Sequence, residues 1–241
     1  MFNISLRRMI SHRLRQIIFS RVNYQNDKNF HGMNQLRRDG AVHIAKFYEE
    51  NLISKKIIKS FDIQKENILL NELPKLNEKL GRYDYRTKIT KYFDQNLLIE
   101  YANQSFFKSY VGQYFGFDPF LRHISVWLDI PKKNEEKKNS QLFHRDDDDA
   151  FLIKTFLCLT DINIGNGPFQ LIKSSHKKPW HKTYMDDDEK ITMTAKKGDL
   201  YLADTNGFHR GMSLKQDYRV LLTAHYVSKY PKKKFLNSVI N

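Results

Sequence analysis

Apolar residues recur with different periods in the two halves of the chain. Between residues 92 and 114 they return every three or four positions, which predicts an amphipathic helix that ends before Gly116. Residues 36–60 predict the end of a helix, an Asp-Gly turn, a short strand and a second helix. Residues 62–90 are lysine-rich and mixed, with one proline and one glycine as breaks. The first half of the chain therefore reads as mainly helical.

The second half reads as a series of short strands. The runs rich in β-branched, aromatic and aliphatic residues are 121–130, 151–162, 168–176, 191–195, 198–204 and 218–227. Turn residues separate these runs, and no helix-length pattern alternates with them. This arrangement favours a β-sandwich or barrel over a parallel α/β sheet. We therefore expect an α+β protein with N-terminal helices packed on a β core.

The composition fits a globular domain in a reducing compartment. Hydrophobic residues make up 40% of the chain and aromatic residues 13%, which is enough apolar material for a core. The single cysteine, Cys158, excludes an intramolecular disulfide and a cysteine zinc cluster. Because it stands in the apolar run FLCL, we expect it to be a small buried residue. A cytoplasmic location is the natural expectation.

The charge is strongly basic, with a formal net value of +14. Such a balance either attracts an anionic partner or belongs to a solvated, lysine-rich surface. Residues 1–26 hold five arginines and no acidic residue, and their apolar positions follow helical spacing. This basic amphipathic segment is typical of a transit peptide or of a helix on a membrane surface, or else packs on the domain. No apolar stretch approaches the roughly 18 residues of a spanning helix.

Two histidines and one aspartate in the β half are spaced like metal ligands. His144 and Asp146 are two residues apart, so both side chains leave the same face of an extended segment. His209 lies 65 residues after His144, at the start of another strand-like run. Two imidazoles and a carboxylate on one face of a metal ion leave three positions open for other ligands. The spacing therefore favours the facial triad found in iron(II) oxygenases.

Arg219 is a candidate for binding an anion. It lies ten residues after His209, inside the apolar run YRVLLTAHYV. A buried guanidinium requires a partner of opposite charge, and the planar fork of arginine matches a carboxylate. The carboxylate of a cosubstrate would supply this partner. The alternatives are a structural aspartate or a position at a solvent-facing strand edge.

The order of motifs from residue 36 to residue 228 resembles that of the phytanoyl-CoA dioxygenase family of iron(II)- and 2-oxoglutarate-dependent oxygenases. Five segments carry the resemblance: RDGAVHIAKF (38–47), FHRD (143–146), LTDINIGNGPFQLIKSSHK (159–177), KGDLYLADTNGFHRG (197–211) and YRVLLTAHY (218–226). At Ser174 the family usually has glycine, so the turn there differs in residue type. The resemblance implies a double-stranded β-helix, also called a jelly roll and cupin-like, with helices packed on it.

The resemblance also implies roles for particular residues. His144, Asp146 and His209 would bind Fe(II), and Arg219 would bind the C5 carboxylate of 2-oxoglutarate. Thr155 matches a small polar contact to the cosubstrate, although the sequence does not decide whether Thr155 or its neighbour Lys154 points inward. The three acidic residues after Asp146 are expected at the rim of the pocket. Because the metal-binding carboxylate is intact, hydroxylation is favoured over halogenation.

The predicted organisation has three parts. Residues 1–35 form a basic amphipathic extension, residues 36–230 form one oxygenase domain, and residues 231–241 form a basic tail. The predicted function is O2-dependent hydroxylation of a small, anionic organic substrate, with succinate and CO2 as coproducts. Two alternatives stay open: a cupin-like metal-dependent hydrolase or isomerase, and a non-catalytic anion-binding module. Nucleic acid is a disfavoured partner, peripheral membrane contact through the N-terminal extension is an open option, and the sequence does not predict an oligomeric state.

Overall fold

The computed structural model describes residues 30–81, 83–132, 139–179, 182–184 and 187–229. Residues 1–29 of the predicted basic extension and the whole predicted tail, residues 231–241, lie outside these ranges. Both therefore stay predictions. Within the part that is described, no helix is long and apolar enough to cross a bilayer.

Helices occupy most of the described first half of the chain, as the sequence predicts. They are α2 (Met33–Asp39), α3 (Phe47–Glu50), α4 (Leu52–Glu78), α5 (Gln95–Ala102) and α6 (Ser105–Phe115). Short 3-10 helices lie at η1 (Thr90–Tyr92), η2 (Asn139–Gln141), η3 (Ile164–Asn166) and η4 (Ser175–Lys177).

Two helices stand where the apolar period predicts one. The carboxylate of Asp94 accepts backbone N–H groups of the first turn of α5 at 2.8 and 3.4 Å, and α5 then stops before Asn103. The next helix, α6, ends at Gly116, whose φ of 82° is the left-handed conformation typical of a glycine that terminates a helix. The period continues across the break because both helices bury one face on the same core.

The sequence pattern predicts only the start of helix α4, which lies in the second helix expected within residues 36–60. The helix has 27 residues and continues through the segment that reads as mixed, with Pro74 inside it, four residues before its end. Its buried apolar positions form a narrow stripe among lysine, glutamate and asparagine, which masks the helical period. The stripe consists of Ile57, Ile58, Phe61, Ile68 and Leu76.

Nine described strands form two antiparallel sheets. The strands are β1 (Ala41–Ile44), β2 (Arg86–Lys88), β3 (Phe120–Asp129), β4 (Leu152–Cys158), β5 (Phe169–Ile172), β6 (Lys190–Met193), β7 (Leu200–Asp204), β8 (His209–Gly211) and β9 (Arg219–Val227). The large sheet has the order β1-β7-β4-β9-β3-β2, and the small sheet has the order β6-β5-β8. This mixture of helices and antiparallel sheets agrees with the predicted α+β class and is compatible with a jelly roll.

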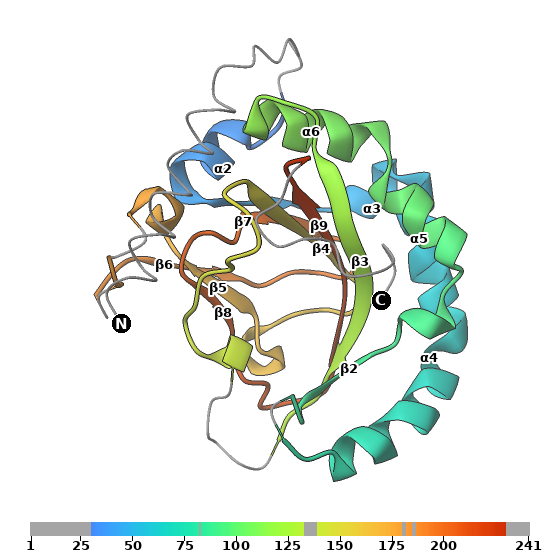
Figure 1. The fold of residues 1–241 in the computed structure, drawn as a ribbon. Coiled ribbons are helices and arrows are strands. Elements are labelled where there is room, and N and C mark those ends of the chain that lie inside the picture. The colour runs from blue at the N-terminus through green and yellow to red at the C-terminus, as the bar shows by residue number, and fades with distance from the viewer. Residues whose placement is uncertain (1–29, 82, 133–138, 180–181, 185–186, 230–241) are drawn as a thin grey trace.

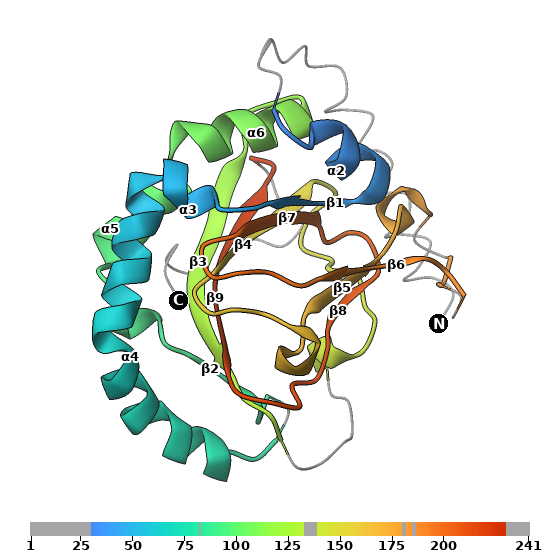
Figure 2. The ribbon, with the colours of Figure 1, turned by 180° about the vertical axis from the view of Figure 1, so that it is seen from behind.

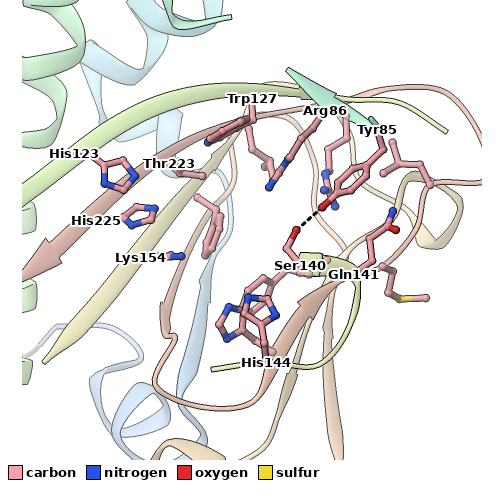
Figure 3. Close-up of a pocket in the computed structure, with 18 residues that line it drawn as sticks. Tyr85, Arg86, His123, Trp127, Ser140, Gln141, His144, Lys154, Thr223 and His225 are labelled. Carbon is pink, nitrogen blue, oxygen red and sulfur yellow. Dashed lines mark hydrogen bonds between the residues drawn. The ribbon is translucent and has the colours of Figure 1, made fainter. Parts of the chain in front are cut away.

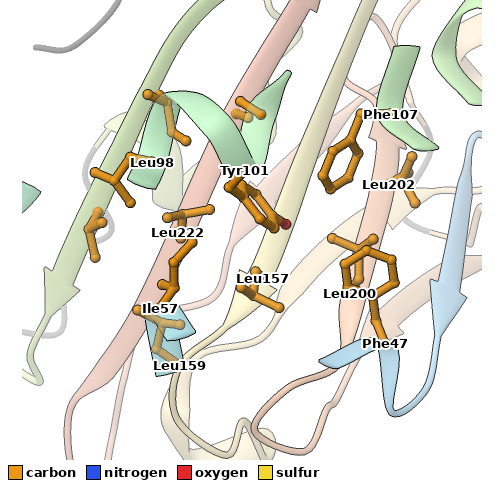
Figure 4. Close-up of a cluster of buried hydrophobic side chains, with 14 of the residues drawn as sticks. Phe47, Ile57, Leu98, Tyr101, Phe107, Leu157, Leu159, Leu200, Leu202 and Leu222 are labelled. Atoms are coloured by element: carbon orange, nitrogen blue, oxygen red, sulfur yellow. The ribbon is translucent and has the colours of Figure 1, made fainter. Parts of the chain in front are cut away.

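The main apolar core lies between the helices and the large sheet. Helices α4, α5 and α6 cover the outer face of that sheet, and the small sheet lies on its other side (Figures 1 and 2). Tyr101, Phe107, Leu157 and Leu222 are 0% exposed in this core, where helix and strand side chains interlock (Figure 4). Each fully buried side chain of this size contributes roughly 1.5–3 kcal/mol to folding through the apolar area that it removes from water.

A smaller apolar cluster joins the two sheets. Cys158, Tyr201 and Leu221 of the large sheet meet Leu171 and Met193 of the small sheet. Cys158 is 0% exposed, which confirms its prediction as a buried apolar residue. The space between the two sheets is therefore filled by apolar side chains around Cys158. Mainly polar, charged and aromatic side chains line the rest of that space.

We expect Leu157→Ala to lower the free energy of unfolding by about 2–5 kcal/mol, because truncation leaves a cavity in the helix–sheet core. Leu70→Ala is the matched control, since Leu70 is 76% exposed on α4 and its removal should change stability by less than about 0.5 kcal/mol. Urea denaturation followed by circular dichroism measures both values. Equal stabilities of the two variants would contradict this packing.

Candidate metal and ligand site

Backbone pairing brings the predicted metal-ligand residues together. His144 and His209 form an isolated antiparallel bridge, in which each N–H donates to the carbonyl of the other at 2.9 Å. Two residues on, the N–H of Asp146 donates to the carbonyl of Thr205, also at 2.9 Å. The segment that carries the His-x-Asp motif is therefore held along the turn before β8. Residues 65 positions apart in sequence become neighbours through these three bonds.

The three side chains are arranged as a metal-binding group. One ligand atom from each of His144, Asp146 and His209 lies within 4.8 Å of the other two. Nε2 of His209 is 3.5 Å from Oδ2 of Asp146, and Nε2 of His144 is 3.9 Å from Oδ1 of Asp146. The group found by geometry is the group predicted from sequence spacing.

Hydrogen bonds behind the two imidazoles orient them for a metal ion. Nδ1 of His144 lies 2.8 Å from the carbonyl of Leu142, and Nδ1 of His209 lies 2.9 Å from the carbonyl of Gly207. A backbone carbonyl can only accept, so Nδ1 carries a proton in each ring, and the neutral form of either ring has its lone pair on Nε2. Metal-binding histidines in proteins have this kind of support. The residues present therefore fit a divalent ion.

The electrostatics of the group match the protonation states that metal ligands need. Burial lowers the pKa of His209 to about 4, although the nearby carboxylate opposes this shift. Burial acts to raise the pKa of Asp146, but the charges of Lys154 and His209 and hydrogen bonding outweigh it, and the pKa falls below its ordinary value. At neutral pH the group thus offers a neutral imidazole and an ionised carboxylate, as metal binding requires.

The inner face of the large sheet adds a lysine to this site. Nζ of Lys154 on β4 lies 2.6 Å from Oδ2 of Asp146. Side chains alternate along a strand, so Lys154 and Phe156 face the pocket while Ile153, Thr155 and Leu157 face the helices. Thr155 is 0% exposed and donates to the carbonyl of Ala224 at 3.5 Å.

This alternation corrects the predicted role of Thr155. Its side chain does not line the pocket and is separated from it by the plane of the sheet, so a contact with a cosubstrate there is wrong. The residue of the pair that points inward is Lys154. The sequence could not decide between them, because the even- or the odd-numbered residues of β4 could face the pocket. Which set does so follows only from the face of β4 that the helices cover.

Arg219 is buried in a cluster of three charged side chains. Arg86, Asp129 and Arg219 stand opposite one another on β2, β3 and β9. The guanidinium of Arg219 donates to Oδ2 of Asp129 at 2.5 and 3.1 Å, and that of Arg86 donates to both oxygens at 2.7 and 3.1 Å. Burial acts to raise the pKa of Asp129, which is 0% exposed, but the two guanidinium charges lower it below its ordinary value.

The partner of the buried Arg219 is thus Asp129, which the sequence did not identify, and Arg86 binds the same carboxylate. A structural aspartate was one of the alternatives for Arg219, and the structure places Asp129 there. Because Arg86 shares the same carboxylate, the cluster retains one net positive charge. Both arginines line the pocket that contains His144 and His209, so this charge faces the same space as the metal-binding group.

The pocket lies between the sheets and has distinct sides. Figure 3 shows Tyr85, Arg86 and Trp127 on one side, His123, His225 and Lys154 on another, and His144 apart from both. The hydroxyl groups of Tyr85 and Ser140 lie 2.6 Å apart, and the guanidinium of Arg86 stacks on the ring of Trp127 at 4.6 Å.

Several pocket residues could have been found from the alternation of polar and apolar residues along β3 and β9. His123, Ser125, Trp127 and Asp129 alternate with apolar residues along β3, so the polar members share one face. Arg219 and His225 share a face of β9 by the same parity. Applying the two-residue period to the polar residues of these strands assigns them to one face of the sheet, the face from which His123, Trp127, Arg219 and His225 line the pocket.

The acidic residues after Asp146 do not all lie at the rim of the pocket. Asp148 pairs with Arg122 at 3.2 Å. Asp149 is 2% exposed, and its carboxylate accepts hydrogen bonds from the backbone and hydroxyl of Ser228 at 2.9 and 2.5 Å. For Asp149 the expectation of a rim position is wrong, because this carboxylate holds the end of β9 in place.

Comparison with known proteins supports the fold. No family model matches the chain, and no curated protein matches it in sequence. Among solved structures, the epimerase SnoN in complex with Fe3+, alpha ketoglutarate and nogalamycin RO is similar with a TM-score of 0.55 at 15% identity, over 83% of each chain. The non-heme alpha ketoglutarate dependent carbocyclase SnoK from nogalamycin biosynthesis gives 0.57 at 12% identity, over 85% of this chain and 86% of that one.

A third similar structure is AviO1 from Streptomyces viridochromogenes Tue57, with a TM-score of 0.53 at 14% identity over 85% of this chain and 97% of that one. At such identities the similarity is one of fold. SnoN and SnoK are non-heme, alpha ketoglutarate-dependent enzymes, which is the enzyme class that the sequence motifs indicate. The resemblance to the phytanoyl-CoA dioxygenase family in particular stays a prediction.

We expect His209→Ala and Asp146→Ala to weaken binding of a divalent metal by on the order of 100-fold, since even loss of a group that supports a ligand costs 10- to 100-fold. Calorimetric titration with Co(II) measures the affinity, and circular dichroism verifies the fold. Asp147→Asn, at the adjacent position in the same acidic run, should keep the metal affinity within a factor of about three. Unchanged affinity in either alanine variant would exclude that residue as a ligand.

Proposed function

We propose that this chain is an iron(II)- and 2-oxoglutarate-dependent dioxygenase that hydroxylates a small organic substrate. The proposal assigns a double-stranded β-helix to residues 36–230, with the two antiparallel sheets as its walls. The observation that carries it is that Arg219 lines the same pocket as His144 and His209, the two histidines of the predicted metal-binding set.

The ligand set favours iron among the metals of proteins. Two imidazoles and one carboxylate suit Fe(II) with three positions left open, whereas structural zinc sites are closed by four protein ligands. In the described part of the chain, no fourth histidine, cysteine or acidic residue joins His144, Asp146 and His209 in the group. The fit of this set to Fe(II) rests on the supported imidazoles and on the ionised Asp146.

The Arg86–Asp129–Arg219 cluster supports a dicarboxylate cosubstrate. Its one net positive charge stands at a buried position in the pocket, where an unpaired charge is costly. Because Nε and Nη2 of Arg219 donate to Asp129, one carboxylate of 2-oxoglutarate would be held by the other edge of the guanidinium, formed by Nη1 and the second N–H of Nη2. Asp129 would fix the orientation of the Arg219 guanidinium. Since the charge of Asp129 balances only one of the two arginines, the presence of Arg86 leaves the cluster with a net positive charge.

With iron and 2-oxoglutarate bound, O2 would be the oxidant: one oxygen atom would enter succinate as 2-oxoglutarate loses CO2, and the other would hydroxylate one C–H bond of the substrate. The chain's own residues would do the rest. His144, Asp146 and His209 fix the position of the reaction, and the aromatic side chains of Phe156, Phe169 and Trp127 along the pocket limit access of water.

The similar structures bear on the outcome of the reaction. SnoN is an epimerase and SnoK is a carbocyclase, so this fold hosts more than one reaction. We assign hydroxylation because the carboxylate ligand Asp146 is present, which disfavours halogenation, and because no feature of the described pocket favours ring closure or epimerisation. A small anionic substrate is part of the same proposal.

We expect anaerobic addition of 2-oxoglutarate to the Fe(II)-loaded protein to give a weak, saturable visible charge-transfer band. The band should be absent in His209→Ala and present in Asp147→Asn. In air, the wild type should release succinate from 2-oxoglutarate even without the substrate, at a slow rate. Absence of both the band and succinate would instead favour a cupin-like hydrolase or isomerase, or an anion-binding module.

We expect Arg219→Met to raise the Kd for 2-oxoglutarate by about 10- to 100-fold, the loss of a charge-assisted hydrogen bond of roughly 1.5–3 kcal/mol. The affinity for Fe(II) should not change, because Arg219 contacts none of its ligands. Thr155→Val is the control: it keeps the shape of the side chain on the helix-facing side of β4 and should leave the Kd unchanged. Equal effects of the two variants would exclude Arg219 as the cosubstrate residue.

A further inference from the structure

Three nitrogen-bearing side chains form a row across the large sheet, away from Arg219. His123 on β3 is paired in register with His225 on β9, and His225 with Lys154 on β4. Residues opposite one another in an antiparallel pair have Cβ atoms about 4.5–5.5 Å apart, so the three side chains are immediate neighbours. The two imidazole centroids lie 3.8 Å apart, and all three residues line the pocket (Figure 3).

His225 has an unsatisfied hydrogen-bonding group at this position. The residue is 8% exposed, and its buried Nδ1 has no hydrogen-bond partner among the residues that the structure describes. A buried polar atom without a partner destabilises the folded state, so such atoms need an explanation. The metal-binding group does not use His225, and neither does the Arg86–Asp129–Arg219 cluster.

Charges around the row make it suited to a negatively charged group. Lys154 contacts Asp146, and on β3 the adjacent Arg122 pairs with Asp148. Arg86 and Lys154 also line the outer part of the pocket together with Lys79 and Lys88. Among the described residues that line these two parts of the pocket, Asp146 is the one acidic side chain.

The imidazoles offer hydrogen bonds without a charge of their own. Burial, reinforced by the positive charge of Lys154, lowers the pKa of His123 to about 4 and that of His225 well below its ordinary value. Each ring is therefore neutral at pH 7 and has one N–H to donate. With the ammonium of Lys154, the row presents donors from three strands.

We propose that His123, His225 and Lys154 form a subsite for an oxyanion of the substrate, a carboxylate or a phosphate. Binding of the oxyanion would satisfy His225 and supply Lys154 with a second anionic neighbour. As a substrate subsite the inference rests on the proposed function, whereas the anion binding itself does not depend on it.

The position of the subsite gives it a role in choosing the C–H bond. Nζ of Lys154 lies 2.6 Å from the candidate ligand Asp146, so a group held by Lys154 is next to the metal-binding residues. Arg219 and His225 are six residues apart on β9, which is roughly 20 Å at about 3.3 Å per residue. The anion of the cosubstrate and the anion of the substrate would thus be held at separate ends of one strand.

The test is NMR of the full chain with 15N-labelled histidine at pH 7.5, without metal, titrated with sodium acetate or with inorganic phosphate. We expect saturable shifts of the His123 and His225 ring signals with at least one of the two anions. If the subsite prefers phosphate to a carboxylate, phosphate shifts these signals and acetate does not. His43, paired with Asp199 at 2.9 Å, is the internal control and should not move. Lys154→Met should weaken the response at least tenfold, and Arg219→Met should leave it unchanged. If neither anion shifts the ring signals of His123 and His225, the proposal is wrong.

Thermal unfolding distinguishes a binding role from a structural one. We expect His225→Phe to remove the anion response of His123 and to raise Tm by about 2–4 °C, because it replaces a buried unpartnered nitrogen with carbon. A lower Tm together with an intact anion response would mean that His225 is structural and would overturn the proposal. His123→Phe is the second variant, and it should also remove the response of His225.

The charge-transfer band separates failure of this inference from failure of the proposed function. The band with Fe(II) and 2-oxoglutarate should persist in His225→Phe, since the cosubstrate is assigned to the Arg219 end. If the wild type shows the band while its imidazoles ignore both anions, the subsite alone is wrong. If the imidazoles respond to an anion and the band is absent, the proposed function fails and the subsite stands as an anion-binding site.

Discussion

The parity of three neighbouring strands, β3, β4 and β9, is the constraint on which the site depends. On each strand one face is apolar and packs against the helices, and the other carries the charged and imidazole groups of the pocket. A slip of one residue in β9 would turn Arg219 and His225 into the helix-facing core. The hydrophobic core thus determines the positions of the polar groups, since each apolar residue that the helices bury aims its neighbour into the pocket.

Those polar groups form a chain of charges whose members depend on one another. Asp129 can balance only one of the two guanidiniums that it binds, and Asp146 contacts Lys154, so the pocket keeps an excess positive charge at the arginine cluster. The excess positive charge is costly in a folded protein without a ligand and becomes favourable when an anion enters. We interpret this excess charge as a feature that lowers the stability of the ligand-free protein and raises its affinity for an anion, a combination that is common at functional sites.

The metal-binding group and the burial of Arg219 could be predicted from sequence, because both depend on short motifs that follow one another in a fixed order. The His-x-Asp spacing and the distal His209 identified the metal-binding group, and the apolar surroundings of Arg219 indicated its burial. Asp129 could not be assigned as its partner, nor Arg86 as the second arginine on that carboxylate, since strand register joins residues 90 and 43 positions apart. Thr155 was misassigned for a related reason: which face of β4 a residue occupies follows only once the face covered by the helices is known. The part of helix α4 beyond residue 60 was not predicted, because its buried stripe is narrow and its exposed surface is polar.

The two ends of β9 suggest how one fold can support different reactions. If the Arg219 end holds the cosubstrate, its chemistry requires little variation, because 2-oxoglutarate is the same in every enzyme that uses it. The His225 end has no such requirement, so its residues can change with the substrate. The epimerase SnoN and the carbocyclase SnoK have a similar fold and different activities, so the fold alone does not determine the reaction. By this argument, the identity of the residues opposite Lys154 is more informative about the substrate than the metal-binding group is.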